Sequence, residues 1–219
     1  RADQGGVPYY SLDNEPALWG GTHVRIHPQP LTFKELLDKS EALAKAIKAV
    51  DPSAKVMGSE SFGAMEMWKC ISGTPTSVPT CSDWNTYTAK YDWAVAAFLG
   101  EMKARSVVAG KRLIDVLAIH WYPEDMGDGR INNGSISNGG TAKDIEARLQ
   151  APRALWDTTY LENSWIPSAM TGNKPVYILA RTLRSIDTAW PGTRLALTEY
   201  NYGGENHWSG ALAQADVLG

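Results

Sequence analysis

The feature that most constrains the fold of this sequence is the unequal length of the connections between its strand-like and helix-like segments. Hydrophobic periodicity predicts strands at 7–12, 54–58, 112–120 and 193–200, and helices at 32–50, 86–106, 174–190 and 208–218. The joints that lead from a helix into the next strand are very short: "DPSA", "AGK" and "PGT". The connections that follow the strands are long and carry most of the Trp, His, Asn and Gly residues.

Alternating strands and helices with this asymmetry are typical of a parallel α/β fold whose functional loops follow the strands. A doubly wound open sheet would produce the same alternation. However, no G-x-G-x-x-G or G-x-x-x-x-G-K-[ST] motif follows any predicted strand. The sequence therefore favours part of a (β/α)8 TIM barrel.

Bulk composition limits the domain count and the partners. A chain of 219 residues, 43% of them hydrophobic, is long enough for one sizeable core and short for two domains. Lys and Arg total 21 against 24 Asp and Glu, and no basic run occurs, so we expect no nucleic-acid partner. No apolar stretch is long enough to cross a bilayer, so we expect no membrane partner.

The aromatic residues are nine Trp, nine Tyr and only three Phe. Part of this excess serves ordinary packing. The remainder suits sugar binding, because a flat ring covers the apolar face of a pyranose while its N–H or O–H group stays available for hydroxyls.

The sequence does not decide the state of its two cysteines. Cys70 and Cys81 are the only cysteines, and they are either a disulfide pair or two unrelated thiols.

The run 125–140, "DMGDGRINNGSISNGG", offers oxygens of the kind that bind calcium but lacks the order of an EF-hand loop. We therefore expect no cofactor and no metal.

Polar residues stand at the end of each predicted strand, and two of these ends carry a glutamate with no adjacent charge: Glu15 and Glu199. The segment Asn14-Glu15-Pro16 by itself is more typical of a helix N-terminus than of a catalytic site. In a barrel, however, both glutamates lie at the same end of the sheet. Hydrolysis of a glycosidic bond needs such a pair, one carboxylic acid to protonate the leaving oxygen and one carboxylate to attack.

Three longer stretches carry a specific resemblance: "YYSLDNEPALWGGTHVRIHPQPLTFKEL", "DVLAIHWYP" and "LALTEYNYGGENHWSGALAQADVLG". Together they resemble glycoside hydrolase family 44, secreted bacterial endoglucanases and xyloglucanases built on (β/α)8 barrels. The resemblance implies that Glu15 is the acid/base after the fourth barrel strand and Glu199 the nucleophile after the seventh. It also implies that Asn14 bonds the sugar 2-hydroxyl, and that His120 and Tyr122 support the nucleophile.

The resemblance is incomplete in two respects. Three strand–helix units would precede this sequence in the family, and an eighth strand would follow it. We therefore expect residues 1–219 to be a single fragment of a TIM-barrel catalytic domain, with strands four to seven and their helices. Residues 59–82 match the family poorly, so Glu60, Trp68 and the two cysteines inherit no role from it.

The resemblance implies a secreted, retaining endo-β-1,4-glucanase that hydrolyses cellulose derivatives or xyloglucan. The alternative is a non-catalytic glucan-binding fragment, inactive because barrel strands are missing. Beside the catalytic pair Glu15 and Glu199, the residues predicted to contact the β-glucan are Asn14, His120, Trp121, Tyr122, Trp165 and Tyr202.

Overall fold

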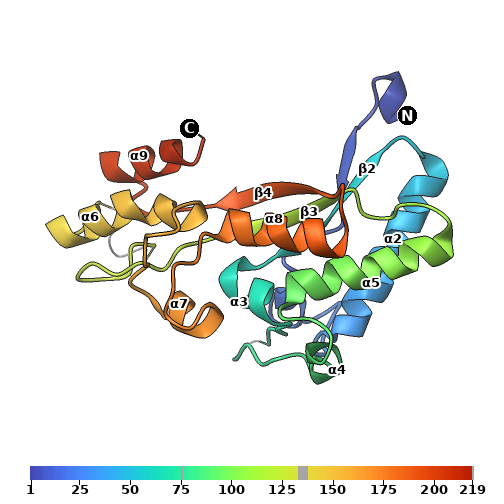
Figure 1. Cartoon of the computed structure of the whole chain (residues 1–219), viewed down its shortest axis with the longest axis horizontal. Coiled ribbons are helices and arrows are strands. Elements are labelled where there is room, and N and C mark those ends of the chain that lie inside the picture. Colours follow the sequence, from blue (N-terminus) through green and yellow to red (C-terminus); the bar gives the residue numbers. More distant parts are fainter. Residues whose placement is uncertain (75, 133–137, 219) are drawn as a thin grey trace. The chain divides into compact units, whose positions relative to one another are not determined.

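The computed structural model describes residues 1–74, 76–132 and 138–218 (Figure 1). Two compact units make up the chain. The first contains residues 1–120 and 184–198, and the second contains residues 121–183 and 199–219.

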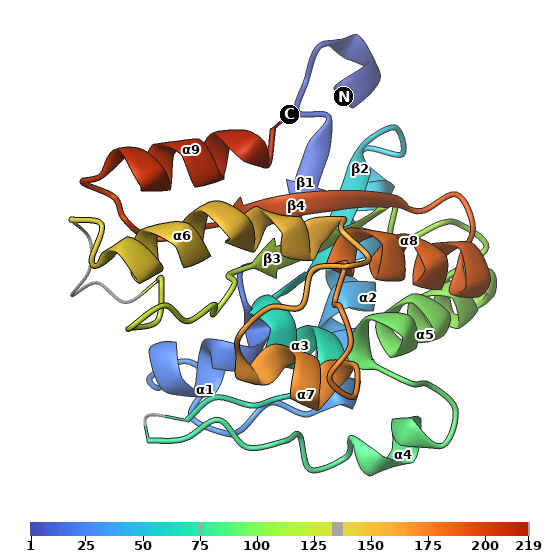
Figure 2. The ribbon, with the colours of Figure 1, turned by 60° about the vertical axis from the view of Figure 1, so that its left-hand side comes forward.

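A four-stranded sheet organises the fold, with the strands in sequential order (Figure 2). The strands are β1 (Tyr9–Ser11), β2 (Lys55–Ser61), β3 (Val116–Trp121) and β4 (Arg194–Tyr200). They run parallel, with Tyr9 opposite Lys55 and Met57 opposite Val116. A doubly wound sheet would reverse its strand order at a switch point, and this sheet does not. The predicted α/β class, a partial (β/α)8 barrel, is therefore confirmed.

Helices follow the strands, as predicted, but they are more numerous than the sequence indicated. The α-helices are α1 (Trp19–Thr22), α2 (Phe33–Val50), α3 (Gly63–Trp68), α4 (Asn85–Thr88), α5 (Ala94–Ala109), α6 (Ala142–Gln150), α7 (Trp165–Met170), α8 (Ile178–Ala189) and α9 (Trp208–Asp216). Short 3-10 turns occur at Ala2–Gln4, Pro16–Leu18 and Ala151–Leu155. Helices α1, α3, α6 and α7 lie in connections for which we predicted no helix.

Helix α2 begins where its sequence predicted. The Thr32 hydroxyl accepts a hydrogen bond from the backbone N–H of Glu35 at 3.1 Å, which satisfies one free donor of the first turn. The Glu35 side chain does not complete the capping box, because its carboxylate lies 2.8 Å from Nε2 of His27 instead.

The helix predicted over 86–106 is wrong in its first part, because the chain breaks between α4 and α5. The ring of Tyr91 covers Gly100, where an added Cβ would lie only 2.5 Å from the Tyr91 hydroxyl oxygen. This hydroxyl also donates to the Glu101 carboxylate at 2.8 Å. Tyr91 therefore folds back over α5, which it could not do from within the same continuous helix.

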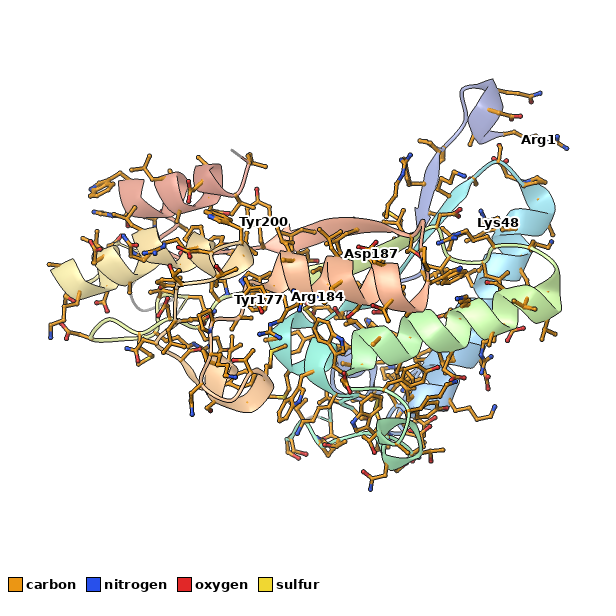
Figure 3. All side chains as sticks on the ribbon, in the orientation of Figure 1. Arg1, Lys48, Tyr177, Arg184, Asp187 and Tyr200 are labelled. Carbon is orange, nitrogen blue, oxygen red and sulfur yellow. A yellow bond between two sulfur atoms is a disulfide. The ribbon has the colours of Figure 1, made fainter. Side chains whose placement is uncertain are left out.

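The core of the first unit surrounds β3, in which every residue is buried. An ion pair anchors α2 to the segment before this strand: the buried ammonium of Lys48, which is labelled in Figure 3, lies 2.6 Å from the partly buried Asp115 carboxylate and donates to the Ala54 carbonyl oxygen. These two contacts provide partners for the buried Lys48 charge.

The second unit has its own apolar cluster, formed by Ile131, Ala151, Tyr202 and Ala213 with Tyr200 packed against it. Helices α6 and α9 pack together beside it (Figure 2). The fully buried guanidinium of Arg148 donates to the carbonyl oxygens of Gly139, Ile131 and Tyr202 and to the Ser209 hydroxyl. This network closes the loops of the unit onto α6.

The structure decides between the two alternatives for the cysteines: Cys70 and Cys81 form a disulfide, with Cα atoms 5.4 Å apart. The bond closes the loop between α3 and α4 in the first unit. Among the helices of the described residues, none has both the length and the apolar character that a bilayer crossing requires.

Candidate active site

Glu15 lies four residues after the end of β1, at the start of the 3-10 turn Pro16–Leu18. Its side chain makes no capping hydrogen bond to that turn. Instead, Oε1 lies 2.8 Å from Nδ1 of His120, on the end of β3. The segment does open a helical turn with Pro16 at its start, but the Glu15 carboxyl group does not cap this turn and is directed to a histidine 105 residues away.

The backbone of this turn adopts a conformation that favours glycine. Glu15 has φ of 43° and Glu60, at the end of β2, has φ of 56°. A non-glycine residue in this region costs about 1–3 kcal/mol, and such residues cluster at functional sites. The backbone N–H of Glu15 donates to the Glu60 carbonyl oxygen at 3.1 Å, which joins the two turns.

The Glu60 carboxylate connects all four strands. It is buried, with 3% of the residue exposed, and it accepts from the Ser11 hydroxyl at 2.6 Å and the Thr198 hydroxyl at 2.8 Å. Its Oε2 also lies 3.7 Å from Nε2 of His120. Burial opposes ionisation of Glu60, but the hydrogen bonds from His120, Ser11 and Thr198 outweigh it and hold the pKa of this carboxyl below its usual value.

His120 is thereby held between two carboxyl groups. Only 1% of the residue is exposed, and its two ring nitrogens face Glu15 and Glu60. A histidine with a carboxylate at one nitrogen has its ring orientation set, so the other nitrogen can hold a reacting group in place.

The second predicted carboxylate, Glu199, lies in the second unit near the end of β4. The Tyr122 hydroxyl donates to its Oε2 at 2.7 Å. Tyr122 follows directly after β3, so each predicted catalytic glutamate is bonded to one member of the predicted pair His120 and Tyr122. The residue before Glu199 is Thr198, which bonds Glu60 and thereby restrains the backbone that carries the nucleophile candidate.

The remaining predicted substrate contacts differ in their exposure. Asn14 is exposed, and Trp165 is half-buried with its indole N–H donating to Glu124. Trp121 and Tyr202 are both 0% exposed, so neither ring has a face open to a sugar in this structure. Contact of these two rings with substrate stays a prediction from the sequence.

The acidic loop considered for calcium is described only in part, since residues 133–137 lie outside the described residues. Within the described part, Asp125 accepts from the Tyr160 hydroxyl and the backbone N–H of Asn163. Asp128 accepts from the side chains of Thr141 and Lys143. Protein donors therefore contact both of these carboxylates.

Comparison with known proteins gives this geometry a family. Residues 1–125, more than half of the chain, match the model of glycoside hydrolase family 44. The chain belongs to glycoside hydrolase family 44. Among its relatives, Endoglucanase A of Paenibacillus lautus is 45% identical over 215 residues, which are 98% of this chain and 29% of that protein.

Solved structures of family 44 agree over the whole chain. An endoglucanase from Clostridium thermocellum is 46% identical with a TM-score of 0.88, and the match covers 100% of this chain and 41% of that one. A Paenibacillus polymyxa xyloglucanase, solved with xyloglucan, is 45% identical with a TM-score of 0.87, over 99% of this chain and 40% of that one. The chain thus spans well under half the length of these family 44 relatives.

From the sequence we did not assign Glu60 or Glu66 to the candidate site. Glu60 stands at a strand end, as Glu15 does, and that position was the signal that could have identified it. Glu66, on α3, is almost fully buried close to Glu15, and no local pattern marks it.

We expect Glu60→Gln to lower the free energy of unfolding by about 1–3 kcal/mol at pH 7, because two hydroxyl donors and His120 lose a buried anion. The folded-state pKa of Glu60 lies below its ordinary 4.5, so its ionised form contributes stability above that pH, and this contribution is lost as pH falls through the folded value. Urea unfolding at pH 7 and pH 4 should therefore show a smaller difference between wild type and variant at pH 4.

The control is Ser11→Ala, which removes one of the donors to Glu60 and should cost about 1 kcal/mol. A Glu60→Gln difference that is equal at both pH values would show that Glu60 is not ionised in the folded protein.

Proposed function

We propose that this chain carries the catalytic residues of a retaining endo-β-1,4-glucanase acting on plant cell-wall glucans. The observation that carries the proposal is the pairing of each candidate glutamate with a polar partner from β3 or the residue after it: Glu15 with His120, and Glu199 with Tyr122. Both glutamates stand near the carboxyl ends of parallel strands, where barrel enzymes hold their catalytic groups.

In the proposed reaction, the Glu199 carboxylate attacks the anomeric carbon and forms a glycosyl-enzyme. Glu15 first donates a proton to the departing glycosidic oxygen and then removes a proton from the incoming water. His120 holds the Glu15 carboxyl group, and the Tyr122 hydroxyl holds the Glu199 carboxylate. A retaining mechanism requires the two carboxyl groups to lie about 5–5.5 Å apart, and we expect a crystal structure to show this separation.

The substrate class is supported by the relatives. One is named an endoglucanase, and another is a xyloglucanase solved with xyloglucan. We propose a soluble β-1,4-glucan or xyloglucan as the substrate, bound without a cofactor. The disulfide between Cys70 and Cys81 supports a secreted protein, because such bonds persist in oxidising compartments.

The test is hydrolysis of xyloglucan and carboxymethylcellulose, followed by reducing-end release, by viscosity and by proton NMR of the first product. We expect a fall in viscosity before many reducing ends appear, and a first product with the β-anomeric configuration. An α-anomer would contradict the retaining mechanism. Binding of both glucans without any hydrolysis would instead support the alternative, a glucan-binding protein.

A further inference from the structure

Glu66 is a buried carboxyl group that the proposed reaction does not use. It lies on α3 with 5% of the residue exposed. The backbone N–H of Phe62 donates to its Oε2, and the backbone N–H of Ala17 also faces this carboxyl group. One side chain thus contacts two backbone segments that are far apart in the sequence.

The two backbone segments that Glu66 contacts follow Glu15 and Glu60, the two glutamates with left-handed backbone. Ala17 comes two residues after Glu15, and Phe62 comes two residues after Glu60. The carbonyl oxygen of Ala17 is also engaged, since it accepts from the backbone N–H of Gly73. Because Glu15 does not adopt its conformation readily, the residues after it must be held by such contacts.

The surroundings of Glu66 disfavour a charge. A cavity of about 10 Å³ beside it is lined by Phe33 and Leu36 of α2, by Ala94, Val95 and Phe98 of α5, and by Ser59 and disulfide-bonded Cys70. The ionisable groups with the largest effect on Glu66 are Glu15 and His120. Burial, with the negative charge of Glu15 as a further contribution, raises the pKa of Glu66 to about 8.

We propose that Glu66 is a positioning residue that holds the turn carrying Glu15. Its carboxyl group accepts from the backbone N–H of Phe62 and faces that of Ala17, and in its neutral form it places no second negative charge beside Glu15. Ionisation would bury a charge among phenylalanine and leucine side chains, which raises the free energy of the folded protein. The kinetic part of this proposal rests on the proposed glycosidase function, whereas its structural part does not.

Two variants separate the hydrogen bonds of Glu66 from its charge. Glu66→Gln keeps the acceptor and cannot ionise, whereas Glu66→Leu keeps the volume and removes the acceptor. Hydrogen exchange at pH 6 should show the amides of Ala17 and Phe62 protected in wild type and in Glu66→Gln. In Glu66→Leu these amides should exchange at least roughly tenfold faster.

Unfolding across pH reports the neutral state without any activity. A group with a raised folded-state pKa binds a proton in the folded protein that the unfolded chain has lost, so its stabilising effect is complete below pH 4.5 and is lost as pH rises towards 8. The unfolding constant of wild type relative to Glu66→Gln should therefore rise by up to about tenfold per pH unit in this window.

Kinetics test the positioning role. At pH 6, Glu66→Gln should keep kcat within about twofold of wild type. Glu66→Leu should lower kcat by about 10- to 100-fold with little change in KM, because a misplaced catalytic group slows the reaction more than it weakens binding.

Glu162→Gln is the matched control, since Glu162 is another buried carboxyl, with a pKa raised to about 7, in the second unit. It should alter the pH dependence of unfolding but leave the amides of Ala17 and Phe62 protected.

Unchanged exchange of both amides in Glu66→Leu, or the same pH dependence of unfolding in Glu66→Gln as in wild type, would overturn the proposal. If wild type hydrolyses no glucan, the proposed function fails, while exchange and unfolding still decide the role of Glu66. If Glu66→Leu does not fold, the pH dependence of unfolding in Glu66→Gln decides the role of Glu66.

Discussion

Glu199→Gln should reduce kcat on xyloglucan by at least roughly 10³-fold, because an amide cannot form the glycosyl-enzyme that the proposed mechanism requires. The substitution keeps the shape of the side chain and an oxygen that accepts from Tyr122. Folding should therefore be preserved, which circular dichroism would verify. The measurement is initial reducing-end release under substrate saturation.

Two further variants make this result specific. Tyr122→Phe removes the hydroxyl donor but leaves the nucleophile, so its loss of kcat should be smaller, about 10- to 100-fold. Glu205→Gln changes an exposed carboxylate six positions further along the chain, and it should retain wild-type activity. More than one per cent of wild-type kcat in Glu199→Gln would mean that another group is the nucleophile.

Glu15→Gln should lower kcat by about 10²–10⁴-fold on xyloglucan, because the departing sugar oxygen no longer receives a proton. With an aryl glycoside whose phenol departs without protonation, the loss in kcat/KM, which reports the first chemical step, should be much smaller. With that substrate, water must still be activated, so the glycosyl-enzyme should accumulate and a burst of phenol should precede slow turnover.

The matched control is Glu35→Gln, because the Glu35 carboxylate also lies 2.8 Å from a histidine, His27, in the same unit. Loss of that pair should leave the rate unchanged on both substrates. An equal loss of kcat/KM on both substrates in Glu15→Gln would show that Glu15 does not act as the acid.

Much of the fold was readable because the relevant signals are local. Thr32 and Glu35 mark the start of α2, and their hydrogen bond depends only on the backbone around them. The short joints before β2, β3 and β4 predicted parallel strands in sequential order, and that order is observed. The predicted helix over 86–106 was wrong because Tyr91 packs on Gly100, a tertiary contact that periodicity does not report.

For the candidate site, too, the sequence determined one part and the tertiary structure another. The sequence by itself determined which residues stand near the strand ends, since a glutamate at the end of a strand or shortly after it is placed by the strand. Only the tertiary structure decided their partners. His120 reaches Glu15 across 105 positions, Thr198 reaches Glu60 across 138, and Cys70 pairs with Cys81 rather than remaining a thiol. Likewise, the pKa of Glu66 is raised because several elements bury it together, and burial is a property of the packed fold, not of the residues next to it in the chain.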